Sequence, residues 1–262
     1  MNWFQVKSYS KYLLSARYKM GHGLHSPFVF NLVREVINCR HQYYAFQTID
    51  ELRRKLSASE DEIEVLDYGA GSVSLNKKRR KVAALVKRSS ISKRYAEILF
   101  RLIAEIKPDN IIELGTSIGI STSYLALSDK RRDVYTIEGC PQTAQVAKST
   151  IEHLRCDNVN HLVGQFKDVL PDLAGKLQKL DFVFFDGHHT KEATIDYFNV
   201  CLPYAGNDTV FVFDDIHWSK GMEEAWDIIC AHPKVTVSMD LFQLGIIFFK
   251  RECQKQHFIV RL

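Results

Sequence analysis

The chain has 262 residues, of which 46% are apolar and 25% charged, and its formal net charge is +4. This composition is typical of a globular protein with one main domain and an extension. The longest apolar runs, such as Phe242 to Phe249, fall well short of the ~20 residues needed to span a bilayer, so we expect no membrane partner. The N-terminal sequence lacks the features of an export signal, and six cysteines without zinc or C-x-x-C spacing suggest reduced thiols. We therefore expect a cytoplasmic protein.

Residues 1–90 are expected to form a mostly helical accessory or lid region, with an apolar stripe that follows a helix start at Pro27. Residues 1–94 are basic, with 18 Lys and Arg against 8 Asp and Glu, whereas residues 95–262 hold 17 against 23. The densest basic run, residues 77–81, could attract RNA or an acidic substrate. Stacking aromatic residues do not interleave with these charges, so we interpret the run as a solvated helix face.

A glycine-rich stretch at residues 63–72 resembles a strand that leads into a nucleotide-binding turn. The chain then becomes strongly basic, and for some 20 residues it offers no apolar strand ending in an acid. Because a ribose-binding partner is missing, we reject this stretch as the main nucleotide site.

Residues 91–262 predict a doubly wound α/β domain, in which apolar strands alternate with helix-sized connections. The expected strands of a mostly parallel, seven-stranded sheet are residues 111–114, 134–138, 161–163, 182–185, 210–213, 235–239 and 245–249. The last two strands are too close in sequence for a helical crossover, so they should form an antiparallel C-terminal hairpin.

The most informative segment, residues 111–121, reads as a buried strand, a glycine turn and a helix start. Gly115 and Gly119 would let the backbone approach a ligand, and Glu138 ends the next strand, where its carboxylate can accept hydrogen bonds from both ribose hydroxyls. The order is E-x-G-x-x-x-G rather than the G-x-G-x-x-G that suits a pyrophosphate. This spacing favours S-adenosylmethionine, which carries no phosphate; an ordinary strand-to-helix turn is the alternative.

These motifs resemble class I S-adenosylmethionine-dependent methyltransferases, whose Rossmann-like sheet also ends in a reversed strand. The resemblance implies an adenine pocket after the third strand, where Gln165 could bond the purine edge and Phe166 could stack on the ring or pack in the core. The expected cofactor-binding residues are Glu113, Gly115, Thr116, Ser117, Gly119, Ser121, Glu138, Gly139, Gln165, Phe166, Asp186 and His188.

Three carboxylates follow two neighbouring strands of the expected sheet. Asp186 follows the strand at 182–185, and Asp214 and Asp215 follow the strand at 210–213, so they should converge as an all-oxygen site for Mg²⁺ or another hard divalent cation. Capping of the following helices is the alternative. Residues 88–250 are similar to metal-dependent O-methyltransferases of the catechol type and of antibiotic-sugar pathways, and that resemblance places the metal ligands at these three aspartates.

The catalytic base is expected just after Asp186. The sugar enzymes carry an aspartate where this chain has His188, and catechol-type enzymes carry a lysine where it has His189, with Lys191 two residues further on. Imidazole titrates near neutral pH, so either histidine could take the proton of a hydroxyl. The candidate catalytic residues are His188, His189 and Lys191.

The function expected from the sequence is S-adenosylmethionine-dependent O-methylation of a small hydroxylated molecule, with Mg²⁺ as a candidate second cofactor. The alternatives are a nucleic-acid methyltransferase that uses the basic N-terminal part, a nicotinamide-dependent oxidoreductase of Rossmann type, and a non-catalytic module that binds the cofactor. The glycine spacing and the C-terminal hairpin argue against the oxidoreductase. The methyl acceptor and the oligomeric state are left open by the sequence.

Overall fold

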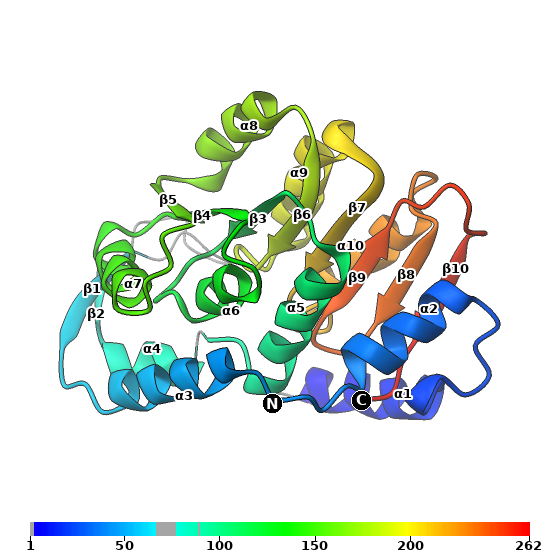
Figure 1. Ribbon diagram of the computed structural model, residues 1–262, viewed down its shortest axis with the longest axis horizontal. Helices are drawn as coiled ribbons and strands as arrows, with labels where there is room; N and C mark the ends of the chain where they lie inside the picture. The colour runs from blue at the N-terminus through cyan, green and yellow to red at the C-terminus, as the bar shows by residue number, and fades with distance from the viewer. Residues whose placement is uncertain (1–2, 67–76, 89) are drawn as a thin grey trace. The chain divides into compact units, whose positions relative to one another are not determined.

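The computed structural model describes residues 3–66, 77–88 and 90–262. It divides into two compact units, of which unit 1 comprises residues 1–40 and 174–262 and unit 2 comprises residues 41–173 (Figure 1). The boundary that we expected at residue 90 stays a prediction. Most of the rejected glycine stretch, residues 67–72, lies outside the described residues. No helix in the described part of the chain has the length and apolar character needed to cross a membrane.

Unit 2 is built on three parallel strands with helices packed against them (Figure 1). Strand β4 lies between β3 and β5, and helices α6 and α7 pack on the strands and on each other. The elements in chain order are α3 (Tyr44–Ser57), β1 (Glu62–Leu66), β2 (Lys77–Lys81), α4 (Val82–Arg88), α5 (Lys93–Ile106), β3 (Asn110–Leu114), α6 (Ile120–Ser128), β4 (Asp133–Glu138), α7 (Pro141–His153) and β5 (Val159–Val163).

The basic run at residues 77–81 is a strand, so the expectation of a helix face was wrong. Strand β2 pairs antiparallel with β1, and this register sets Glu62 opposite Lys81 and Glu64 opposite Arg79. The Arg79 side chain also forms an ion pair with Glu62 at 3.6 Å. Opposite charges in facing positions stabilise a strand pair, and no local helical pattern reveals such a partner in advance.

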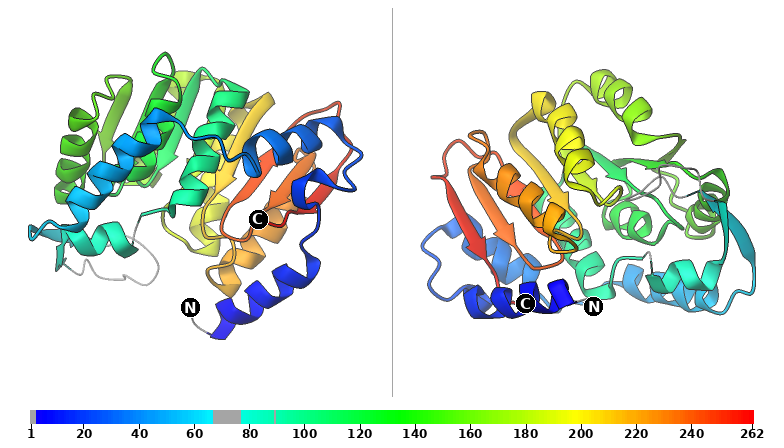
Figure 2. Two further views of the ribbon diagram at one scale, coloured as in Figure 1. Left: turned by 60° about the horizontal axis from the view of Figure 1, so that its bottom comes forward. Right: turned by 180° about the vertical axis from the view of Figure 1, so that it is seen from behind.

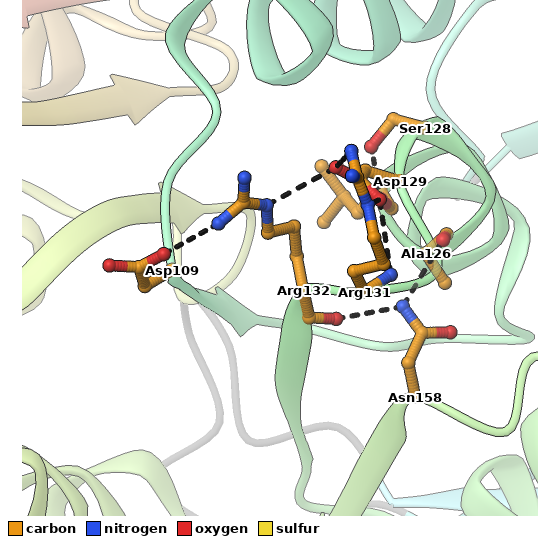
Figure 3. Close-up of polar contacts among 8 residues, drawn as sticks. Asp109, Ala126, Ser128, Asp129, Arg131, Arg132 and Asn158 are labelled. Carbon is orange, nitrogen blue, oxygen red and sulfur yellow. Dashed lines mark hydrogen bonds and ion pairs between the residues drawn. The ribbon is translucent and has the colours of Figure 1, made fainter.

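The turn between α6 and β4 is fixed by a polar cluster (Figure 3). Asp129 accepts two hydrogen bonds of 2.8 Å from the guanidinium of Arg131 and one of 3.2 Å from Arg132. The amide of Asn158 donates to the backbone oxygens of Ala126 and Arg132 at 3.2 and 2.8 Å. These contacts hold the start of β4, the strand that carries Glu138 at its other end.

Unit 1 holds five paired strands, in the order β6, β7, β9, β8 and β10. Strands β6 and β7 are parallel, and β8 and β9 form the expected antiparallel hairpin. Helix α2 lies on one face of the hairpin strands and α10 on the other (Figures 1 and 2). The elements after residue 174 are β6 (Leu180–Phe185), α9 (Lys191–Cys201), the 3-10 turn Leu202–Tyr204, β7 (Ala205–Phe213), α10 (Lys220–Ala231), β8 (Val237–Asp240), β9 (Gly245–Phe248) and β10 (Gln256–Ile259). Helix α8 (Phe166–Leu177) contains the division between the units.

Apolar side chains explain why β6 and β7 lie inside unit 1. Every residue of β6 is buried, as are the last five residues of β7. Phe185 and Phe213, which end the two strands, stack with their ring centroids 4.4 Å apart. A continuous apolar run of this kind is typical of a strand covered on both faces. The packed ends of these strands position the aspartates that follow them.

The N-terminal part of unit 1 is helical, as expected, and contacts the C-terminal strand. It contains α1 (Trp3–Ser15), a short 3-10 turn (Lys19–Gly21), α2 (Pro27–Asn31) and a π-helical turn (Leu32–Ile37). The Tyr12 hydroxyl donates to the Val260 backbone oxygen at 2.6 Å, and Arg17 forms a parallel bridge with Val260. Strand β10, parallel to β8, was not anticipated from the sequence.

Candidate functional site

The glycine turn after β3 adopts backbone conformations that only glycine reaches without strain. Gly115 and Gly119 have φ angles of 108° and 84°. A Cβ atom at Gly119 would lie 3.2 Å from Cγ2 of Thr150 and 3.4 Å from Cα of Ala147, so α7 also approaches closely there. Both the conformation and the packing require glycine at this position. The turn therefore presents bare backbone at the start of α6.

Glu138 faces this turn, as the sequence predicted. Its Oε2 accepts a hydrogen bond from the backbone N–H of Ser117 at 2.9 Å, and its Oε1 accepts one from Cys140 at 2.8 Å. Burial raises the pKa of the carboxyl, while the backbone donors, including Gly139, lower it in part. The side chain is only half-buried. Because a carboxylate has about four lone-pair sites, it retains acceptor capacity for hydroxyl groups of a ligand.

Glu113 lies beneath the turn and is fully buried. Its Oε2 accepts hydrogen bonds from Thr122 at 2.5 Å and from Thr136 at 2.6 Å, and Thr136 is in turn hydrogen-bonded to Thr116 at 2.6 Å. Burial raises the pKa of Glu113, and hydroxyl donors, Ser121 first among them, oppose that shift. Glu113, Thr116 and Ser121 thus form a polar support for the loop, a role that the sequence pattern did not distinguish from ligand contact.

The segment expected to form the adenine pocket follows β5. The backbone N–H of Gly164 donates to the backbone oxygen of Glu138 at 2.9 Å, which ties this segment to the end of β4. The Gln165 side chain is half-buried, whereas Phe166 is 9% exposed and begins α8. Gln165 is thus accessible to a ligand, whereas Phe166 is largely covered.

In unit 1, Asp214 interacts with both of the other predicted carboxylates, Asp186 and Asp215. Asp214 is buried, and its Oδ1 has no hydrogen-bond partner among the described residues. Burial and the charge of Asp215 raise the pKa of Asp214 to about 8, and a hydrogen bond with Asp186 opposes the shift. Asp215 has a φ of 55°. Within the described part of the chain, no group of three or more His, Cys, Asp or Glu side chains is arranged to hold a metal ion.

The three candidate bases have different partners. Nδ1 of His188 is hydrogen-bonded to the Tyr197 hydroxyl at 2.6 Å, and Nε2 of His189 lies 3.7 Å from Oδ1 of Asp186. Burial lowers the pKa of His189, which keeps the imidazole neutral. Lys191 forms a 2.7 Å ion pair with Glu224, whose hydrogen bond raises the lysine pKa. A charged, paired ammonium is a poor proton acceptor, so the geometry favours a histidine.

The sequence analysis missed His217, which anchors the loop after β7. Its Nδ1 lies 2.7 Å from Oε1 of Glu223, and its Nε2 lies 2.8 Å from Oδ2 of Asp240. The imidazole also stacks on Phe242 with centroids 5.2 Å apart. The one sequence signal for this histidine was its position close to Asp214 and Asp215. Its contacts fix the loop that begins with Asp214.

Comparison with known proteins gives one match that spans both the turn and the aspartates in the sequence. Residues 112–216 match the family model described as a methyltransferase domain. This part of the chain is similar to that family. It includes the glycine turn, Glu138, Gln165 and the aspartates after both strands of unit 1.

One curated relative and two solved structures show the same likeness. The chain is 32% identical over 136 residues to a catechol O-methyltransferase of Mycobacterium tuberculosis, an alignment that covers 51% of this chain and 60% of that protein. It superposes on an O-methyltransferase of Bacillus cereus in complex with S-adenosylhomocysteine, with a TM-score of 0.57, 19% identity and coverage of 80% and 93% of the two chains. The O-methyltransferase TomG of Streptomyces achromogenes, in complex with S-adenosylmethionine, gives a TM-score of 0.57, 17% identity and coverage of 80% and 91%. At such identities the solved structures establish the fold, which is the Rossmann-like α/β fold expected from the sequence.

Proposed function

We propose that this protein is an S-adenosylmethionine-dependent methyltransferase that methylates a hydroxyl group of a small molecule. One observation carries the proposal: the Glu138 carboxylate accepts a hydrogen bond from the Ser117 backbone N–H, so the acid and the glycine turn form one site. The names of the relatives support the cofactor and the oxygen acceptor.

The residues of unit 2 fit the cofactor. S-adenosylmethionine supplies an electrophilic methyl group on a sulfonium. Glu138 has acceptor capacity left for the ribose hydroxyls, and the bare backbone at Gly115 and Gly119 leaves room for the methionine tail. Glu113, Thr116 and Ser121 hold the turn from below. We assign ligand contact to Gly115, Ser117, Gly119, Glu138, Gly139 and Gln165.

A divalent cation fits Asp186 and Asp214. The buried Oδ1 of Asp214 has no protein partner in the described residues, and carboxylate oxygens suit a hard cation. Mg²⁺ is usually bound by one or two carboxylates and retains waters, so two aspartates suffice without a third. A cation held there would favour the ionised form of an acceptor hydroxyl.

We assign the role of proton acceptor to His189. Its Nε2 lies 3.7 Å from Oδ1 of Asp186, beyond hydrogen-bond distance, whereas Nδ1 of His188 is already hydrogen-bonded to the Tyr197 hydroxyl. The imidazole would take the proton of the acceptor hydroxyl as the methyl–oxygen bond forms and the methyl–sulfur bond breaks, with S-adenosylhomocysteine as the leaving group. His188 then acts as a structural neighbour of this base.

The proposed setting is the cytoplasm. The six cysteines all lie in the described part of the chain and are free thiols, as is usual in a reducing compartment. RNA is the competing acceptor class, because residues 1–94 are basic. RNA binding would weaken steeply with salt, whereas transfer to a small neutral molecule would not.

The first test is calorimetric titration with S-adenosylhomocysteine, followed by methyl transfer from S-adenosylmethionine to a panel of small phenols, sugars and RNA. We expect binding of the cofactor product and transfer to a small hydroxylated compound. EDTA should lower the transfer rate and Mg²⁺ should restore it in the wild type, whereas Asp214→Asn should not respond to Mg²⁺. Absence of cofactor binding would refute the function. Normal activity in EDTA would exclude a role for the cation and leave the proposed methyl transfer unaffected.

A further inference from the structure

Helix α1 exposes several large apolar side chains, while two of its polar side chains, Gln5 and Ser8, are buried. Trp3 and Leu14 are 84% and 88% exposed, and Val6, Tyr9 and Leu13 are between 37% and 42% exposed. These residues fall on one face at helical spacing. The opposite face, which is buried in unit 1, carries Gln5, Ser8 and Tyr12. Figure 2 shows α1, in dark blue, along the outside of unit 1. This inverted arrangement indicates that the apolar face has a partner of its own.

The helix is firmly attached to unit 1, so its outward face is fixed. The Tyr12 hydroxyl donates to the Val260 oxygen at 2.6 Å, and the Gln5 amide donates to the Trp218 oxygen at 3.3 Å. The rings of Tyr9 and Tyr12 pack against Phe242 at centroid distances of 4.8 and 5.3 Å. The apolar stripe is therefore a preformed ridge.

The charge around the ridge is positive. Helix α1 contains Lys7 and Lys11, both exposed, and no acidic residue. Residues 1–40 as a whole contain six Lys and Arg and a single acid, Glu35. An anionic partner would complement these charges, and it would also have to accept tryptophan and leucine side chains.

We propose that α1 docks on an anionic lipid surface, with its axis parallel to the membrane. Such a surface offers negative headgroups to Lys7 and Lys11 and an apolar interior to Trp3, Val6 and Leu14. The absence of a spanning segment from the sequence does not bear on a helix that lies flat in the interface. This docking is independent of the proposed methyl transfer.

A second copy of the chain suits this face less well. Two copies of α1 in a symmetric contact would bring four lysines together, and the helix has no acid to pair with them. The face is also a convex ridge. A lipid interface accepts such a ridge without a matching groove, whereas two convex ridges of two copies fit together poorly.

The test is co-sedimentation of the full chain with phosphatidylcholine vesicles that contain or lack phosphatidylglycerol. We expect binding only to the anionic vesicles, weakened at least ten-fold by Leu14→Glu. Lys7→Gln and Lys11→Gln should each weaken it ~5-fold at low salt, because each lysine near an anionic surface contributes ~1 kcal/mol. Ile228→Glu is the matched control, since Ile228 is 47% exposed on α10 of the same unit; it should bind as the wild type does.

Three results would overturn the proposal. The first is no sedimentation of the wild type with anionic vesicles, and the second is equal binding by Leu14→Glu and the wild type. The third is a dimer in gel filtration that Leu14→Glu dissociates, because the ridge would then serve a second copy. Circular dichroism of each variant should match the wild type, since Leu14 and both lysines are exposed.

Discussion

Replacement of Glu138 by glutamine should weaken cofactor binding by about 10- to 100-fold. The carboxylate accepts hydrogen bonds from the backbone N–H groups of Ser117 and Cys140 and is proposed to accept the ribose hydroxyls as well. Glutamine keeps one acceptor oxygen, but its NH2 group is a donor and cannot accept a hydrogen bond from a backbone N–H or a ribose hydroxyl. A hydrogen bond to a charged group contributes ~1.5–3 kcal/mol, and 1.4 kcal/mol corresponds to a ten-fold change in affinity.

The assay is calorimetric titration of S-adenosylhomocysteine into wild type, Glu138→Gln and a control, Glu152→Gln. Glu152 is an exposed glutamate on α7 of the same unit, so its substitution removes the same charge away from the turn. Thermal unfolding without ligand separates a loss of affinity from a loss of folding. Wild-type affinity in a folded Glu138→Gln variant would refute the assignment of Glu138 to the ribose.

Three further outcomes are expected. His189→Asn should lower kcat ~100- to 10,000-fold with unchanged S-adenosylhomocysteine affinity, and kcat near the wild-type value in steady-state kinetics would dismiss this base. Gly245→Ala should destabilise unit 1 by ~1–3 kcal/mol in urea unfolding, because a Cβ would lie 2.6 Å from a Trp226 ring carbon. The control Gly206→Ala should have little effect, because its Cβ would meet only an ordinary 3.9 Å contact. Burial lowers the pKa of His217, but hydrogen bonds with Asp240 and Glu223 outweigh it and raise the pKa above 6.5. The stability that His217 contributes is thus present below pH ~6.5 and lost as pH rises through the raised pKa. A His217→Gln variant whose unfolding free energy depends on pH as that of the wild type does would contradict this prediction.

The glycine turn and its acid were predictable because their signals are local. Gly115 and Gly119 mark a turn within five residues, and Glu138 directly ends the next apolar strand. Backbone conformation and strand alternation depend on near neighbours, so the spacing alone indicated that turn and acid belong together, and the contact between Ser117 and Glu138 confirms it.

The features that sequence reasoning missed depend on distant partners. The basic run is a strand that pairs antiparallel with β1, where Glu62 and Glu64 face it. His217 gains its role from Asp240, 23 residues away on β8. Short strand β10 is defined by its pairing with β8 rather than by its own pattern. The aspartates after β6 and β7 could be located along the chain from the sequence, whereas the interactions of Asp214 with Asp186 and Asp215 depend on side-chain packing.

The bond between Tyr12 and Val260 has a consequence for how the protein matures. Its two ends are 248 residues apart, so unit 1 cannot close until Val260 has been synthesised and has left the ribosome. At 5–20 residues per second, the first helix waits roughly 10–50 s for its C-terminal strand. During that interval α1 has neither its polar contacts nor its anchor. Early capture of nascent chains by chaperones, and sensitivity to tags fused near residue 262, would follow from this delay.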